Sequence, residues 1–293
     1  VGSAYELTGG TLAGTGTVTV DGTLLWTGGA MRDAGKLALS AGAVGAISGA
    51  ATKGLDFGRI FENAGTVTAS GGAVLFNRSG AGGGAVIDNL AGGVFEVQGD
   101  TDLEHNFGSV GSRVTNAGLF RKSGGGETVI GSNVVPFVNT GTVEIANGTL
   151  RLDAGGSSAG AITSSAGTTL DFRGGTFTPE PGGTLQLGGG LTVSGGTVVF
   201  PEDIQVAGPV RVTGGAVTFA AGLGSTAEFV LSGGTARFDA DHSFASCTPS
   251  GGTHLYFPSD PDRPQQTWSR GTRHVDFRGT GGYVLAPPST VID

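Results

Sequence analysis

Hydrophobic residues in the C-terminal half of the chain recur at a fixed interval. The segment VRVTGGAVTF at 210–219 is preceded nineteen residues earlier by LTVSGGTVVF and followed nineteen residues later by FVLSGGTARF. Within each segment, apolar residues alternate with polar or small ones, and a Gly-Gly pair separates two such runs. Alternation with a period of two is typical of β-strands, and glycine accepts the positive φ of a tight corner. The pattern predicts two short strands and one corner per repeat.

A phenylalanine closes each repeat and provides an alignment point. These anchors are Phe200, Phe219, Phe238, Phe257 and Phe277. A third short apolar run, which begins at Ile204, completes the unit. Three short strands per repeat, with equivalent residues stacked from one coil to the next, are typical of a solenoid. We therefore expect an all-β fold, a single-stranded parallel β-solenoid with three short strands per coil.

Asparagine followed two places later by glycine marks earlier coils. Asn63, Asn116 and Asn139 share this context, Asn89 has a similar one, and the successive intervals are 26, 27 and 23 residues. Asparagine tolerates turn conformations, and its amide can stack on equivalent amides to form a ladder. Two segments nearby, 67–76 and 143–152, also fit the ten-residue pattern and align Phe76 and Leu152 with the later phenylalanines.

These two patterns divide the chain without dividing the fold. Residues 1–155 are expected to form longer coils of about 23–27 residues with Asn-x-Gly corners. Residues 156–293 are expected to continue as shorter coils of about 19–20 residues with Gly-Gly corners. Because like coils stack on like coils, we expect one continuous rod.

The repeated Phe, Val and Gly-Gly positions, together with the Asn-x-Gly coils, resemble secreted proteins with parallel β-helices. The resemblance is to adhesins of the filamentous-haemagglutinin and autotransporter-passenger type. It implies a right-handed coil and a location outside the cell or on its surface, although the residues themselves leave the handedness open. The asparagine corners also look like the ladders of β-helical polysaccharide lyases, but no catalytic motif of that family matches.

Composition narrows the partners. The 16 basic and 24 acidic residues give a net charge of −8, and no basic run is present to follow a phosphate backbone. Nucleic acid is therefore not expected as a partner. The single cysteine, Cys247, excludes a disulfide within the chain. No apolar run approaches the roughly 20 residues that a membrane-spanning helix needs.

Lys122 and Glu127 break the apolar pattern. If Phe120 points inward, both charged residues fall at inward positions, and a buried pair would be costly without mutual hydrogen bonds. The third glycine between them permits a slip of one residue, which turns Glu127 outward and places Thr128 and Ile130 inside. We favour the slip, because buried charges are rare.

Asp100, Asp102 and Glu104 form the densest acidic stretch. Such a stretch suits a calcium site or an acid–base pair for glycan cleavage. No calcium-loop spacing is present, so we favour a solvated loop and expect no metal and no cofactor.

The segment 258–267 replaces the third strand of its coil with proline and charge. We expect it to project as a candidate binding loop through Asp260, Asp262, Arg263, Gln265 and Gln266. A corner that blocks edge pairing is an equally good interpretation.

These observations favour an extracellular structural or adhesive module that lacks catalytic residues. Its partners would be a cell-surface protein, a glycan or copies of itself. The alternative is a carbohydrate-active β-helix enzyme, a polysaccharide lyase, hydrolase or depolymerase, with paired carboxylates on neighbouring coils. Ice binding is less favoured, because the outward column of Thr197, Ala216 and Thr235 is not a regular threonine array.

Overall fold

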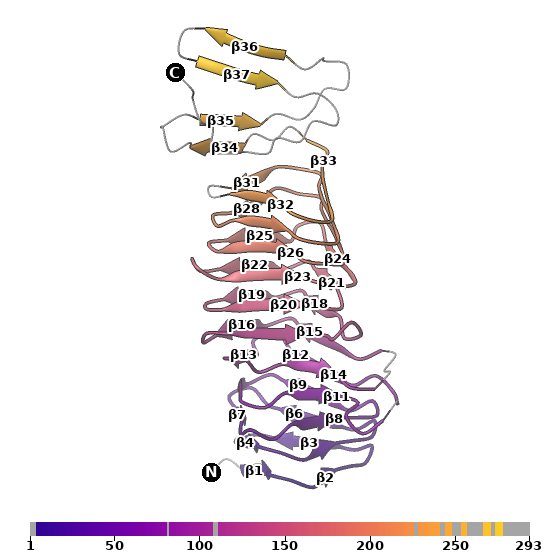
Figure 1. Ribbon diagram of the computed structural model, residues 1–293. Helices are drawn as coiled ribbons and strands as arrows, with labels where there is room; N and C mark the ends of the chain where they lie inside the picture. Colours follow the sequence, from indigo (N-terminus) through magenta and orange to yellow (C-terminus); the bar gives the residue numbers. More distant parts are fainter. Residues whose placement is uncertain are drawn as a thin grey trace. The chain divides into compact units, whose positions relative to one another are not determined.

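The computed structural model describes residues 4–80, 82–107, 111–225 and 228–240, together with four later strands. The chain divides into two compact units, Val1–Asp239 and Ala240–Asp293. The first unit contains three parallel sheets of eleven strands each, named A, B and C here. The chain passes from A to B to C and then returns to A, so that three consecutive strands form one coil and eleven coils are stacked (Figure 1). The expected parallel β-solenoid with three strands per coil is confirmed.

Each sheet takes every third strand of the chain. Sheet A consists of β1 (Ala4–Leu7), β4 (Thr23–Trp26), β7 (Val44–Ile47), β10 (Thr66–Ser70), β13 (Val94–Gln98), β16 (Leu119–Ser123), β19 (Thr142–Ile145), β22 (Ala161–Ser164), β25 (Thr184–Leu187), β28 (Ile204–Val206) and β31 (Leu223–Ser225). Sheet B consists of β2 (Thr11–Leu12), β5 (Ala30–Met31), β8 (Lys53–Leu55), β11 (Val74–Phe76), β14 (Leu103–His105), β17 (Glu127–Ile130), β20 (Thr149–Leu152), β23 (Thr169–Phe172), β26 (Gly190–Val193), β29 (Val210–Val212) and β32 (Phe229–Leu231). Sheet C consists of β3 (Thr17–Val20), β6 (Lys36–Leu39), β9 (Ile60–Asn63), β12 (Val86–Asn89), β15 (Arg113–Asn116), β18 (Phe137–Asn139), β21 (Gly156–Ser158), β24 (Thr176–Pro179), β27 (Thr197–Phe200), β30 (Ala216–Phe219) and β33 (Thr235–Phe238).

Alternating side chains build one core along the first unit. In β13, for example, Phe95 and Val97 are buried while Glu96 between them is only partly buried. The buried apolar residues form a single cluster that extends from Leu7 in coil 1 to Phe219 in coil 10. Because each strand bonds to strands in the coils before and after it, backbone groups are satisfied without a thick core.

Coil lengths vary more than the sequence suggested. Residues paired across sheet A are 19 apart from Ala4 to Thr23, 28 apart from Thr66 to Val94, and 23 apart from Ala161 to Thr184. The expected long coils therefore begin only after the first coil, and one coil beyond residue 155 is long as well. The extra residues lie at the corners, where they do not disturb strand register.

One position of sheet C carries both patterns that the sequence revealed. Asn63, Asn89, Asn116 and Asn139 pair in register at the ends of β9, β12, β15 and β18. The next residues in the same column are Ser158 and Pro179, and the column continues as Phe200, Phe219 and Phe238. We call this the sheet C column. The asparagine corners and the phenylalanine anchors thus occupy the same position in different coils.

The alignment of Phe76 and Leu152 with these phenylalanines is wrong. Phe76 ends β11 and Leu152 ends β20, and both strands belong to sheet B. The ten-residue pattern describes two strands and a corner, and in the early coils that corner joins A to B, whereas later it joins B to C. A local pattern of strand, Gly-Gly and strand cannot distinguish one corner of the coil from another.

The second unit contains antiparallel pairs. Strand β34 (Phe244–Cys247) pairs with β35 (Thr253–Tyr256), and β36 (Gln266–Arg270) pairs with β37 (Arg273–Phe277). This differs from the expected continuation of parallel coils to residue 293. The inward position of Val193 and Val212 would hold Ser250 and Arg270 in such coils, and buried polar residues without partners oppose a shared core. Phe257 lies outside the described residues. Nowhere in the described part of the chain is a helix long and apolar enough to cross a membrane.

Candidate functional site

The outer face of sheet B carries a charged cluster across coils 5 to 8. Its members, named the sheet B cluster here, are Asp102, Glu104, Glu127, Arg151, Asp153 and Asp171. Arg151 is central, because its strand neighbours in register are Val129 in coil 6 and Asp171 in coil 8. Glu127 lies two residues before Val129 on the same strand. Strand register, not sequence proximity, therefore assembles the cluster.

Arg151 binds two carboxylates of this cluster. Its Nε and Nη2 atoms donate to the two carboxylate oxygens of Asp153 at 2.7 and 2.9 Å, and Nη1 donates to Glu127 Oε1 at 2.5 Å. The hydrogen bond to Asp153 is the main cause of the raised pKa of Arg151. A forked arginine–carboxylate pair is a rigid arrangement, so Glu127 is held in a defined position.

Asp102 is the half-buried carboxyl of the cluster. Burial raises its pKa to about 6, and the negative charges of Glu104 and Glu127 act in the same direction. The hydrogen bond from the Val129 backbone N–H to Asp102 Oδ1, at 2.7 Å, and the charge of Arg151 oppose the rise. Desolvation is the larger effect, so Asp102 exchanges its proton near neutral pH.

Asp171 extends the cluster into coil 8. Burial raises its pKa, while the hydroxyl of Ser194 donates to both of its carboxylate oxygens at 2.8 Å. Sequence reasoning missed Arg151 and Asp171. Each sits at an outward position of an ordinary strand pattern, and only the coil-to-coil register shows that they are adjacent.

The slip of one residue at Glu127 is confirmed. Glu127 is exposed, whereas Thr128 and Ile130 are buried. Lys122 points inward and is fully buried, so the two residues do not pair. Instead, Lys122 Nζ donates to the carbonyl oxygens of Ser123 and Gly124 at 3.2 and 2.9 Å. Burial lowers the pKa of Lys122, and nearby Asp100 opposes that change.

Lys53 has an equivalent role in coil 3. Its Nζ donates to the carbonyl oxygens of Gly49, Ala51 and Gly72 at 2.9–3.1 Å, and burial lowers its pKa. Both lysines therefore satisfy carbonyl groups at the corner between sheets A and B. Buried ammonium groups with several carbonyl acceptors are explained as structural cations.

The expected asparagine ladder is present and buried. Nδ2 of each asparagine donates to Oδ1 of the next at 2.7 Å, from Asn63 through Asn89 and Asn116 to Asn139. Asn139 ends the series by donating to the Ser158 hydroxyl at 2.9 Å. These four residues are structural corners, as expected, because their amides also bind the backbone of the turn, as in Asn63 Nδ2 to the Val94 carbonyl at 3.0 Å.

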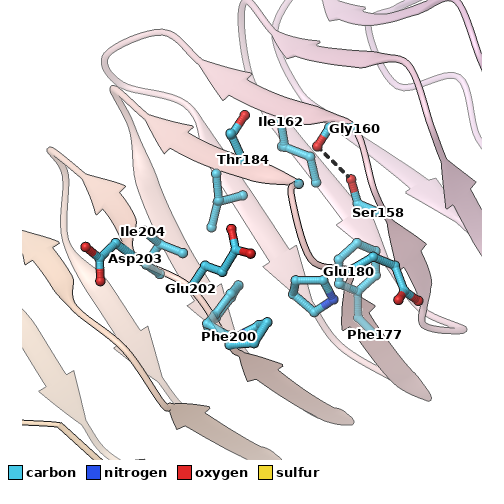
Figure 2. Close-up of a pocket in the computed structure, with 14 residues that line it drawn as sticks. Ser158, Gly160, Ile162, Phe177, Glu180, Thr184, Phe200, Glu202, Asp203 and Ile204 are labelled. Carbon is cyan, nitrogen blue, oxygen red and sulfur yellow. Dashed lines mark hydrogen bonds between the residues drawn. The ribbon is translucent and has the colours of Figure 1, made fainter.

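A small cavity lies where the ladder ends (Figure 2). Successive C–A corners differ in length here, with residues 159–160, 180–183 and 201–203 between the strands, so they cannot stack evenly. Ser158 donates to the Gly160 carbonyl at 3.3 Å, and Phe177 and Phe200 supply apolar walls. The cavity volume of about 20 Å³ suits a single water molecule and excludes a sugar ring.

Acidic residues at the mouth of this cavity do not converge. In Figure 2 the carboxylates of Glu180 and Asp203 point in opposite directions, with Glu202 between them. Glu202 accepts a hydrogen bond from the Gly182 N–H at 3.0 Å, and Asp203 accepts one from the Gly222 N–H at 2.6 Å. These bonds tie neighbouring corners together, which explains the carboxylates without a ligand.

The acidic stretch at 100–104 is divided between two environments. Asp100 lies at the A–B corner over Gly126, where any side chain would collide with its carboxylate, whereas Asp102 and Glu104 belong to the sheet B cluster. Among the residues that the structure describes, no group of three His, Cys, Asp or Glu side chains could hold a metal ion. Asp260, Asp262, Arg263 and Gln265 lie outside the described residues, and Gln266 begins β36.

Comparisons with known proteins leave the chain without a shown family. Residues 234–293 match the family described as bifunctional DNA primase/polymerase, N-terminal (Prim-Pol). The match covers about a fifth of the chain and falls almost wholly in the second unit. No curated protein and no solved structure matches the chain significantly.

Proposed function

We propose that the first unit is a rigid extracellular rod with a structural or adhesive role. The observation that carries this proposal is the uninterrupted stack of eleven parallel coils around one core. A solenoid of this kind holds surface groups at a coil spacing of about 4.8 Å, which suits repetitive or extended partners. Cell-surface glycans, cell-surface proteins and copies of the chain are the partners proposed, since fold alone does not choose among them.

Binding without turnover tests the rod. The full chain would be applied to a glycan panel and to intact cells, with a heat-unfolded sample as the control for nonspecific adsorption. Saturable binding to one surface, together with no release of products, is the expected result. If the folded and unfolded samples adsorb equally to every surface, the adhesive role is excluded. Antibody labelling of the chain on unpermeabilised source cells tests its location independently.

A second candidate function is cleavage of a polysaccharide at the sheet B cluster. The observation that favours it is the pair formed by Asp102, whose pKa is about 6, and Glu127, which is paired with Arg151. Asp102 would donate a proton to the leaving oxygen, and ionised Glu127 would act as base or nucleophile. Strand geometry separates the two backbone positions by about 8 Å, near the 6.5–9.5 Å that separates the carboxyl groups of inverting glycosidases.

Release of reducing or unsaturated ends from a broad polysaccharide panel tests this candidate. Turnover that is lost in both Asp102→Asn and Glu127→Gln, but kept in the exposed-site control Asp21→Asn, would establish an enzyme. Without turnover on any polysaccharide, the sheet B cluster has no catalytic role and the structural interpretation stands.

A further inference from the structure

The contact between coils 5 and 6 is uneven around the first unit. In sheet A, β13 and β16 pair over five residues, and in sheet C, β15 and β18 pair over three. In sheet B, β14 and β17 pair only through Leu103 and Ile130. On its other side, β17 pairs with β20 over four residues. One face of the solenoid is therefore loosely joined at this level, which we call the sheet B seam.

The Asp102 side chain takes over a backbone position at the sheet B seam. The Gly131 N–H donates to the Leu103 carbonyl at 3.0 Å, as in a regular parallel ladder. Two residues earlier, the regular acceptor for the Val129 N–H would be the carbonyl of residue 101. Val129 instead donates to Asp102 Oδ1 at 2.7 Å. A second side-chain bond, from Thr128 Oγ1 to the Gly99 carbonyl at 3.2 Å, assists the junction.

Charges from three coils surround this carboxylate. Glu104 follows it on its own strand, Glu127 lies on β17 in coil 6, and Arg151 lies on β20 in coil 7. Arg151 is already engaged by Asp153 and Glu127, which limits the compensation it gives to Asp102. The ionised carboxylate is therefore half-buried beside two like charges, while a protonated carboxyl keeps an acceptor for the Val129 N–H.

We propose that the sheet B seam is a pH-responsive joint, in which protonation of Asp102 tightens the junction between coils 5 and 6. Ionisation above neutral pH loosens one face of the solenoid while sheets A and C keep the coils together. The raised pKa of Asp102, about 6, agrees with this direction. A carboxyl whose pKa is raised on folding contributes stability below its unfolded value of 3.8, and loses that contribution as the pH rises through about 6.

Hydrogen exchange of the full chain at several pH values tests the joint. Peptides that cover 127–131 are compared with peptides from β16, after correction for intrinsic exchange rates. Between pH 7.5 and pH 5, local opening at 127–131 should fall about tenfold, since one unit of the pKa difference corresponds to a factor of ten. The β16 peptides should change little. Equal behaviour of the two regions would exclude a local joint.

Two variants assign the effect to Asp102. Asp102→Asn keeps the acceptor and removes the charge, so its seam should be tight at pH 7.5 and nearly independent of pH. Its melting temperature should exceed that of the wild type at pH 7.5 by a few degrees, with the difference vanishing near pH 4. Asp21→Asn on coil 1 is the matched control and should show no such difference. If Asp102→Asn keeps the wild-type pH dependence at 127–131, the proposal is wrong.

Discussion

Coils 3 to 6 and coils 9 to 11 fill the same sheet C column in opposite ways. In the earlier coils the column is a buried chain of amides, Asn63 to Asn139, each bonded to the next. In the later coils it is a stack of rings, in which the centroids of Phe200 and Phe219 are 5.6 Å apart and those of Phe219 and Phe238 are 5.1 Å apart. Both arrangements repeat with the coil, but one uses directional bonds and the other uses contact area.

Corner length explains why the two solutions occur where they do. Asparagine coils are 23–27 residues apart in register, and their amides bind backbone groups of the turn, such as the Gly65 N–H to Asn63 Oδ1 at 3.0 Å. Phenylalanine coils are 19 residues apart, so the corner is short and its backbone bonds directly to the next coil, as in Ala220 N–H to the Phe200 carbonyl. Long corners need a polar side chain inside, whereas short corners leave that space to apolar packing.

Exchanging the two chemistries should have the largest effect. Phe219→Asn removes a buried ring that contacts two others and places an amide in an apolar column. Loss of the ring and burial of an unpaired amide together should lower the free energy of unfolding by roughly 5 kcal/mol. Urea denaturation followed by circular dichroism measures this change. A loss below about 1 kcal/mol would mean that the two columns are chemically interchangeable.

The reverse exchange in the ladder should cost less. Asn116→Leu keeps the size but removes bonds to Asn89, Asn139 and the Thr142 carbonyl, so the expected loss is about 3 kcal/mol. Phe219→Leu is the matched control, and a hydrophobic replacement there should cost less than about 1.5 kcal/mol. The comparison fails if both leucine variants lose the same free energy in the same urea titration.

Removing an interior lysine should have a moderate effect. Lys122→Met leaves the Ser123 and Gly124 carbonyls without their donor but also removes a desolvated charge, so about 1–2 kcal/mol should be lost at pH 7. Because burial lowers the pKa of Lys122, the wild type should gain stability as the pH rises toward 10.5, whereas the methionine variant should not. Thermal melts from pH 7 to 10.5 would contradict this if the gap between the two proteins narrowed.

Extending the ladder should have the smallest effect. Ser158→Asn adds an amide beside the cavity of about 20 Å³, where Gly160 and Thr184 supply lining atoms. A further rung should change the free energy of unfolding by less than about 1 kcal/mol, in the stabilising direction. Ser157→Asn on the outward side of the same strand is the control. Destabilisation by more than about 1 kcal/mol would show that Pro179 prevents another rung.

Much of the solenoid was predictable from local patterns. Three strands per coil, the asparagine ladder and the outward turn of Glu127 all follow from alternation, spacing and the cost of burying charge. The side of the coil on which a segment lies was not predictable, as Phe76 and Phe200 show, because each strand–corner–strand unit looks alike. The parallel coils also end at Phe238, where the alternation weakens but the phenylalanine spacing persists.

The candidate site depended on register throughout. Asp102 and Glu127 were both noted in the sequence, but Arg151 and Asp171 were not, and nothing local connects the four. Paired residues from Asp102 to Asp171 belong to coils of unequal length, so no fixed interval relates them. Their common face and the resulting rise in the pKa of Asp102 arise only when the coils are stacked.

The sequence by itself determined the repeating unit of this protein, because hydrophobic alternation and glycine or asparagine corners are local properties of the chain. It also determined which residues must be inside a coil, since the side-chain period of a strand is two. Only the tertiary structure decided how coils align, where parallel stacking ends and which charges meet on sheet B. Those outcomes depend on corner length and coil-to-coil hydrogen bonding, which connect residues that lie some twenty or more positions apart.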